Sequence, residues 1–306
     1  MTYKGNYRDL YLQTLIDEAK KGEEFFIVSS DLGAPCLDEF RRIFPKRFIS
    51  VGIAEQNMIS VSCGLALAGK KVIAYSANPF PYLRAYDQLR NAVCTMRLPI
   101  TIAGVCSALE QVHYGITHFV TEDYALMRTL PEIRYINVSD QNMAIYSAKR
   151  SLEATEPLYL TLNRSSERYI REIDDNEWNN GYRVLIENNY NYIITMGTFT
   201  SYVLDLINEG KVSAGLIDAF SNKIDASICK YVKGKKVIIY EEHNKACGLG
   251  TTISDICAEN HSSCIISKIG FDYSSGYPQF YGSRDFFLEK YGMDEKSLLK
   301  KCESIF

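Results

Sequence analysis

Short apolar runs alternate with segments of helical periodicity along the first half of the chain. The apolar runs cover residues 25–33, 48–51, 70–78, 98–106, 133–140 and 157–164. The segments between them, such as 83–96, place apolar residues at helical spacing. Strands that alternate with helices in this way predict a mainly parallel sheet with helices on both faces.

The pattern changes between residues 165 and 183, where the chain is charged, rich in Asp and Asn, and without a sustained period. This composition is typical of a linker between domains. A second series of apolar runs then follows at 191–199, 213–220, 235–244 and 263–271. The prediction is an α/β protein of two doubly wound domains with mainly parallel sheets, one at 1–175 and one at 183–306.

Charge and composition exclude several classes of function. The 306-residue chain has a formal charge of -3, which gives no electrostatic reason to bind nucleic acid or an anionic membrane. The first residues are charged throughout, unlike a signal peptide, and the longest apolar stretch, 63–77, is interrupted by glycine and lysine. The nine cysteines are scattered, without the spacing of a zinc site, as expected for free thiols in the cytoplasm.

The first candidate for chemistry is Glu55, which follows the apolar run ending at Val51 and begins a helix rich in small residues. Ligands of open α/β sheets gather at such strand-to-helix junctions. A buried carboxylate there could share a proton with a heteroaromatic nitrogen. The alternative is a glutamate in the first helical turn that only complements the helix dipole.

The second candidate is a glycine-containing loop with His113 and His118. Histidines five positions apart suit a helical metal site poorly, and no third ligand is evident, so no metal site is predicted on this chain. Acid-base chemistry or substrate contact is the functional interpretation. Two surface histidines are the alternative.

Two further places could bind a ligand. Phe80, Tyr82 and Tyr86 stand close together after a predicted strand, where an aromatic ring could form a wall for a flat cofactor, although core packing is the default for Tyr86. Arg164 ends another predicted strand, where it could bind a phosphate or carboxylate, or instead pair with Glu167. No phosphate-binding glycine loop of standard spacing occurs.

Taken in order, several segments resemble the C-terminal half of transketolase and its relative deoxyxylulose-phosphate synthase. The specific parts are GIAEQN at Gly52, RAYDQLRN at Arg84, GITH at Gly115 with EDYALMRTLP after it, and EEHNKACGLG at Glu241. The resemblance covers nearly the whole chain. It implies that the first domain binds the aminopyrimidine of thiamine diphosphate and that the second has a mainly structural role.

The resemblance also implies roles for single residues. Glu55 would bond the pyrimidine ring nitrogen and so activate the cofactor, and Phe80, or Tyr82, would stack on the pyrimidine. Asp31 would lie near the thiazolium ring. His118 would contact the oxygens of a sugar substrate, and Arg164 would hold its far end.

Two features depart from the family pattern. His113 and Tyr114 stand where the family often has an acidic pair that contacts substrate hydroxyls, and Cys106 replaces a histidine that commonly assists phosphate binding. The resemblance implies two-carbon ketol transfer from a ketose to an aldose. Because of these departures we expect a sugar that is deoxygenated, modified or not conventionally phosphorylated.

The Gly-Asp-Gly motif of the family's diphosphate-binding domain does not occur in the sequence. The resemblance therefore implies a split transketolase, in which an N-terminal subunit holds Mg²⁺ and the diphosphate and this chain is the C-terminal subunit of an α2β2 assembly. The nearest alternatives are the beta subunit of a 2-oxoacid dehydrogenase and a deoxyxylulose-phosphate-synthase-like enzyme. A non-catalytic scaffold or regulatory partner is the alternative of another class.

Overall fold

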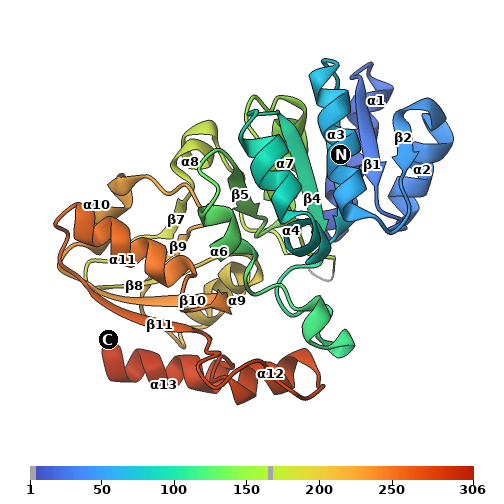
Figure 1. Ribbon diagram of the computed structural model, residues 1–306. Coiled ribbons are helices and arrows are strands. Elements are labelled where there is room, and N and C mark those ends of the chain that lie inside the picture. Colours follow the sequence, from blue (N-terminus) through green and yellow to red (C-terminus); the bar gives the residue numbers. More distant parts are fainter. Residues whose placement is uncertain (1–4, 165–167) are drawn as a thin grey trace. The chain divides into compact units, whose positions relative to one another are not determined.

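The computed structural model describes residues 5–164 and 168–306, which form two compact units of α/β architecture (Figure 1). The first unit contains the described residues up to Ser107 and those of Leu126–Arg171. The second contains Ala108–Ala125 and Glu172–Phe306. The predicted α/β class is confirmed, and each unit has its own sheet.

The sheet of the first unit has six strands, all parallel, in the order β2-β1-β3-β4-β6-β5. Its strands are β1 (Phe25–Ser29), β2 (Phe48–Ser50), β3 (Lys71–Ala77), β4 (Ile100–Val105), β5 (Arg134–Asn137) and β6 (Leu158–Leu162). Its helices are α1 (Tyr7–Lys20), α2 (Pro35–Ile43), α3 (Glu55–Leu67), α4 (Phe80–Arg84), α5 (Tyr86–Gln88) and α7 (Gln141–Leu152). Every strand predicted in this half of the sequence is present.

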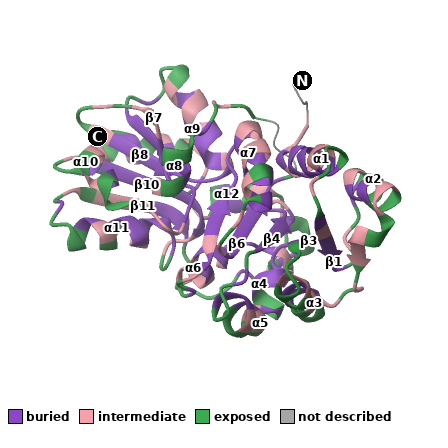
Figure 2. Cartoon of the chain, turned by 90° about the horizontal axis from the view of Figure 1, so that it is seen from above, coloured by how far each residue is buried: buried purple, intermediate pink, exposed green. Residues whose placement is uncertain are grey.

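The strands of the first sheet read as continuous apolar runs because both of their faces are covered. All residues of β4 and β6 are buried, and Figure 2 shows buried strands beneath helices whose outer faces are exposed. The segment predicted as one helix over 83–96 is divided into the end of α4, α5 and a π-helical turn at Leu89–Cys94.

The second sheet has five strands in the order β11-β10-β8-β9-β7, all parallel except the β7–β9 pair, which is antiparallel. Its strands are β7 (Arg183–Ile186), β8 (Asn191–Thr195), β9 (Gly215–Asp218), β10 (Lys236–Asn244) and β11 (Ile265–Phe271). Its helices are α8 (Asp175–Asn180), α9 (Thr198–Asn208), α10 (Cys229–Val232), α11 (Leu249–Glu259), α12 (Arg284–Lys290) and α13 (Glu295–Ile305). Helix α6 (Asp123–Arg128) begins in the second unit and ends in the first.

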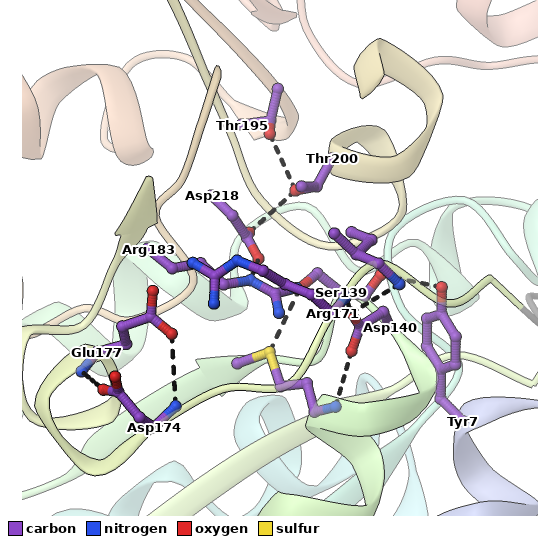
Figure 3. Close-up of polar contacts among 12 residues, drawn as sticks. Tyr7, Ser139, Asp140, Arg171, Asp174, Glu177, Arg183, Thr195, Thr200 and Asp218 are labelled. Atoms are coloured by element: carbon purple, nitrogen blue, oxygen red, sulfur yellow. Dashed lines mark hydrogen bonds and ion pairs between the residues drawn. The ribbon is translucent and has the colours of Figure 1, made fainter. Parts of the chain in front are cut away.

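The segment predicted as a linker contains structure that the sequence analysis missed. Helix α8 begins with a capping box, in which the Asp174 side chain accepts from the Glu177 backbone N–H and the Glu177 carboxylate accepts from that of Asp174 (Figure 3). Strand β7 follows directly. Residues 165–167 of the predicted linker lie outside the described residues.

A buried ion pair joins the first residue of β7 to the last residue of β9. Arg183 donates from Nε to Oδ2 of Asp218 over 2.9 Å, and neither side chain is exposed (Figure 3). Thr200 donates to the other carboxylate oxygen, Oδ1, at 2.9 Å. This network satisfies charges that would be costly to bury alone, and it fixes β7 against β9.

No helix in the described ranges is long and apolar enough to cross a bilayer.

Candidate active site

Five of the predicted site residues follow five neighbouring strands at the carboxyl edge of the first sheet. In the order of the strands, from β2 to β6, they are Glu55, Asp31, Phe80, Cys106 and Arg164. The edge includes the β1–β3 neighbourhood, where the strand order reverses direction. Open α/β sheets bind ligands outside the carboxyl ends of their strands near such a point. The first sheet therefore brings these residues to one edge.

Glu55 is the first residue of α3, and its side chain is only 4% exposed. The turn before it requires a left-handed residue, which Gly52 supplies with φ +72°. The helix dipole favours a negative charge at this end of α3. Oε2 of Glu55 accepts a hydrogen bond from Nη1 of Arg84 over 3.1 Å. The carboxylate is thus buried and held by one cation.

The guanidinium of Arg84 also covers an aromatic ring. Its Cζ lies 4.0 Å from the centroid of the Phe80 ring, one turn back along α4. Phe80 is half-buried, whereas Tyr82 is fully buried. Of the two aromatic residues considered for stacking on a flat cofactor, Phe80 therefore offers the accessible ring.

The turn that carries Phe80 is fixed by a buried residue that the sequence analysis did not single out. Asn78 accepts at Oδ1 from the Tyr159 hydroxyl over 2.5 Å, and its backbone N–H donates to the Val105 carbonyl. A Cβ at Gly104 would lie 2.0 Å from that Oδ1, so only glycine leaves room for the amide. Asn78 thereby ties the end of β3 to β4 and β6.

The remaining residues at this edge differ in exposure. Asp31 is exposed, whereas Cys106 is buried. The backbone of both residues lies in the left-handed region, with φ +62° at Asp31 and +71° at Cys106. Arg164 is exposed. The alternative partner considered for Arg164, Glu167, lies outside the described residues.

The other predicted residues gather in the second unit. The Tyr114 ring lies between those of His113 and His118, with centroids 4.1 Å and 4.9 Å away. Nδ1 of His118 lies 2.9 Å from the Thr117 hydroxyl, a contact that orients the imidazole. Tyr114 is exposed and His118 half-buried, so this cluster of three rings is accessible.

A buried cluster of ionisable residues at the end of β10 was also missed. Glu241 accepts hydrogen bonds from the backbone N–H groups of Leu249 and Gly250, at the start of α11, over 2.7 and 2.9 Å. A Cβ at Gly248 would lie 2.1 Å from the Glu241 carboxylate, so glycine at this position allows β10 and α11 to pack closely. Burial raises the pKa of Glu241.

His243 lies in the same cluster, with Nε2 3.3 Å from Oδ1 of Asp123. Both side chains are buried. Burial alone would lower the pKa of His243, but the carboxylates of Asp123, Glu241 and Glu242 outweigh it and raise the pKa above the ordinary value. The segment EEHNKACGLG at Glu241 marked this region through the family resemblance, but no role was assigned to Glu241 or His243.

A metal centre would need several ligands in one place. Within residues 5–164 and 168–306, no three His, Cys, Asp or Glu side chains gather closely enough to hold a metal ion. The first sheet's edge offers a buried carboxylate, an accessible aromatic ring and a cation, which belong to Glu55, Phe80 and Arg84.

Comparison with known proteins identifies the family. Residues 4–168 match the family described as "Transketolase, pyrimidine binding domain". The chain is 30% identical to a protein assigned as a transketolase C-terminal section in Methanocaldococcus jannaschii, over 98% of this chain and 95% of that protein. It is 27% identical to a subunit of the apulose-4-phosphate transketolase of Phocaeicola vulgatus, over 83% of this chain and 84% of that protein.

A solved structure shares the fold across almost the whole chain. It is described as a split gene transketolase in an inactive beta4 tetramer, and it superposes with a TM-score of 0.82 at 24% identity. The match covers 98% of this chain and 99% of that one. The family match over more than half of the chain, together with the 30% identical relative, settles the assignment: the chain belongs to the transketolase family.

Proposed function

We propose that this chain is the C-terminal subunit of a split, thiamine-diphosphate-dependent transketolase. It transfers a two-carbon ketol unit from a ketose to an aldose. The observation that carries the proposal is the buried Glu55 carboxylate beside the accessible Phe80 ring at the carboxyl edge of the first sheet. Support comes from relatives of similar length that are named as a section or a subunit of a transketolase.

The residues at this edge fit an aminopyrimidine. A buried carboxylate can accept a hydrogen bond from a protonated ring nitrogen and hold the ring in the tautomer that transfers a proton. Oε2 of Glu55 is bonded to Arg84, so Oε1 is the oxygen that we assign to the ring nitrogen. Phe80 then stacks on the ring, and Asp31 lies near the second ring of the cofactor. When bound, thiamine diphosphate supplies the electron sink for the two-carbon unit.

The sugar has its own set of residues in this proposal. We assign His118 to the substrate oxygens, where a hydrogen-bond donor stabilises charge that develops on oxygen. His113 and Tyr114 contact the hydroxyls, and Arg164 holds the far end, with Cys106 at the position of a phosphate-binding histidine. Because a histidine and a tyrosine replace an acidic pair, we propose a modified or unconventionally phosphorylated sugar.

We propose that an N-terminal transketolase subunit holds the diphosphate and Mg²⁺, in an α2β2 assembly in the cytoplasm. Four large apolar side chains of the first unit are at least 48% exposed, as expected where another chain covers the surface: Ile53, Leu67, Leu83 and Met96. No disulfide joins any of the nine cysteines, all of which lie in the described ranges, as expected in a reducing compartment.

Reconstitution tests this function. The chain is purified with and without a candidate N-terminal subunit, and ketol transfer is assayed with thiamine diphosphate and Mg²⁺ against a panel of ketose donors. Activity is expected only in the mixture. Activity of the chain alone, or a mixture that acts only on pyruvate, would contradict the proposal. If xylulose 5-phosphate and ribose 5-phosphate were the best substrates, the modified-sugar part would be wrong.

A further inference from the structure

The loop that carries the cluster of three rings is part of the second unit, although it lies between two segments of the first in the sequence. Leu109, Val112 and Phe119 are buried in the hydrophobic core of the second unit. The Phe119 ring meets the Phe287 ring of α12 edge-on, with centroids 5.1 Å apart. Burial of three large apolar side chains holds both ends of the loop on this unit.

Backbone pairing closes the loop. An isolated antiparallel bridge joins Ala108 to Val120, and the Val120 N–H donates to the Ala108 carbonyl over 3.0 Å. At the tip, Gly115 packs so closely on Tyr281 that a Cβ would lie 2.6 Å from that ring. Since the Tyr114 ring contacts the rings of both His113 and His118, a displacement of the loop moves all three rings together.

The C-terminal end of the loop is held by polar contacts to Asn244, the last residue of β10, and to Tyr273, which follows β11. The Asn244 N–H donates to the Thr121 carbonyl over 2.9 Å, and the Thr121 hydroxyl lies 3.1 Å from that of Tyr273. Next to them is the buried contact of His243 with Asp123. The raised pKa of His243 favours the charged imidazole, which strengthens this contact.

Asp123 is the carboxylate to which His243 is most closely bound. Nδ1 of His243 is 3.8 Å from Oε2 of Glu241, and that oxygen already accepts from the Leu249 N–H. The Glu242 carboxylate forms an ion pair with Arg284 and accepts a hydrogen bond from the Thr198 hydroxyl. The main partner of the His243 imidazole is therefore a carboxylate of the loop and not one of β10, so the imidazole links β10 to the loop.

We propose that His243 is a positioning residue for ketol transfer, and that through Asp123 it fixes the loop that presents His118 to the sugar. The inference rests on the proposed function, since it takes His118 as the substrate contact. It gives the second unit a part in substrate binding, beyond the structural role that the family resemblance implied.

The test compares His243→Ala and His243→Gln in the reconstituted two-chain enzyme, with His261→Asn, a change at an exposed histidine of the same unit, as the control. Removing the imidazole is expected to lower kcat/KM for the sugar by on the order of 10- to 100-fold, mainly through KM. Affinity for thiamine diphosphate and association with the partner stay at the wild-type level. Glutamine, which can still donate to Asp123, restores most of the loss.

A double variant separates positioning from a general loss of structure. If His243 acts through His118, His118→Ala with His243→Ala is no worse than His118→Ala alone. Multiplied defects, or an unchanged KM in His243→Ala, would overturn the inference.

Hydrogen exchange in the full chain gives a readout that does not depend on activity. His243→Ala should increase exchange in residues 108–125 and leave β8 and β9 protected. Unchanged exchange in the loop would overturn the inference. If the wild-type pair transferred no ketol unit, the proposed function would fail, while this measurement would still decide whether His243 holds the loop.

Discussion

Arg84 donates a hydrogen bond to the buried carboxylate of Glu55 over 3.1 Å, although the two residues are 29 positions apart in the sequence. The Arg84 side chain is 49% exposed, so the partner of the carboxylate reaches solvent while the carboxylate does not. This arrangement pairs a buried carboxylate with a cation and leaves the second carboxylate oxygen for a ligand. It also places the Arg84 guanidinium over the Phe80 ring. Arg84 therefore contacts both Glu55, proposed to activate the cofactor, and Phe80, proposed to stack on it.

The first prediction separates the two aromatic residues considered for stacking. Phe80→Ala should weaken the binding of thiamine diphosphate to the two-chain enzyme roughly fivefold, because a stacked ring contributes about 1 kcal/mol beyond its area. Tyr82→Leu, which also removes an aromatic ring, should leave the cofactor affinity of the folded enzyme unchanged, since Tyr82 is fully buried. Calorimetric titration measures both. A larger effect for Tyr82→Leu would assign the stacking ring to Tyr82.

The second prediction concerns the fit of Asn78 against Gly104. Gly104→Ala forces the amide of Asn78 to move, and so should lower the Tm of the chain and weaken cofactor binding together. Gly64→Ala in α3 is the matched control, because a Cβ there meets nothing within 4 Å. It should stabilise the chain by about 0.5–1 kcal/mol through helix propensity. Equal effects of the two changes would contradict the packing argument.

The third prediction concerns the buried pair of Arg183 and Asp218. Asp218→Ala leaves an arginine buried without its partner and should destabilise the second unit by about 3–5 kcal/mol in urea unfolding. The half-exposed pair of Lys20 and Glu39 is the control, and Glu39→Ala should cost less than about 1 kcal/mol. A loss below about 1 kcal/mol for Asp218→Ala would show that the buried pair is not needed for folding.

Much of this fold was predictable because local pattern and burial agree. Strands buried on both faces appear as apolar runs, and Glu55 was identified because it begins a helix directly after a strand. Helix α8 was missed because it is short and polar, and strand β7 because it has only four residues and begins with an arginine. The burial of Arg183 depends on Asp218, a residue of another strand, and that pairing has no local signal.

The membership of the loop in the second unit was not predictable for a related reason. Leu109, Val112 and Phe119 look like ordinary apolar loop residues until the core they enter is known. The contact of His243 with Asp123 joins distant parts of the sequence. Sequence pattern locates groups beside their own strand or helix, whereas tertiary contacts decide which groups meet.

The fourth prediction follows from the raised pKa of His243. Its folded-state pKa lies above the ordinary value of 6.5, so the imidazolium stabilises the fold. That contribution is complete below the unfolded-state pKa and is lost as pH rises through the folded-state pKa. The groups that face the ring are Asp123, Tyr124, Glu241 and Glu242.

Thermal unfolding of the full chain measures this effect. The Tm advantage of the wild type over His243→Gln should therefore be larger at about pH 6 than at about pH 9. His261→Asn, at an exposed position, should show no such dependence. An advantage that grows with pH would contradict the assignment of His243 as a charged partner of Asp123.

The measurement that tests the central claim most directly is ketol transfer by Glu55→Gln in the reconstituted two-chain enzyme, with Glu39→Gln as the control. Glutamine keeps the size of the side chain but cannot hold the charge that accepts the ring-nitrogen proton. We predict that Glu55→Gln still associates with the partner and loses ketol transfer by roughly 10²–10⁴-fold, while Glu39→Gln is unaffected. Activity of Glu55→Gln within about tenfold of the wild type would contradict the assignment of Glu55 as the residue that activates the cofactor.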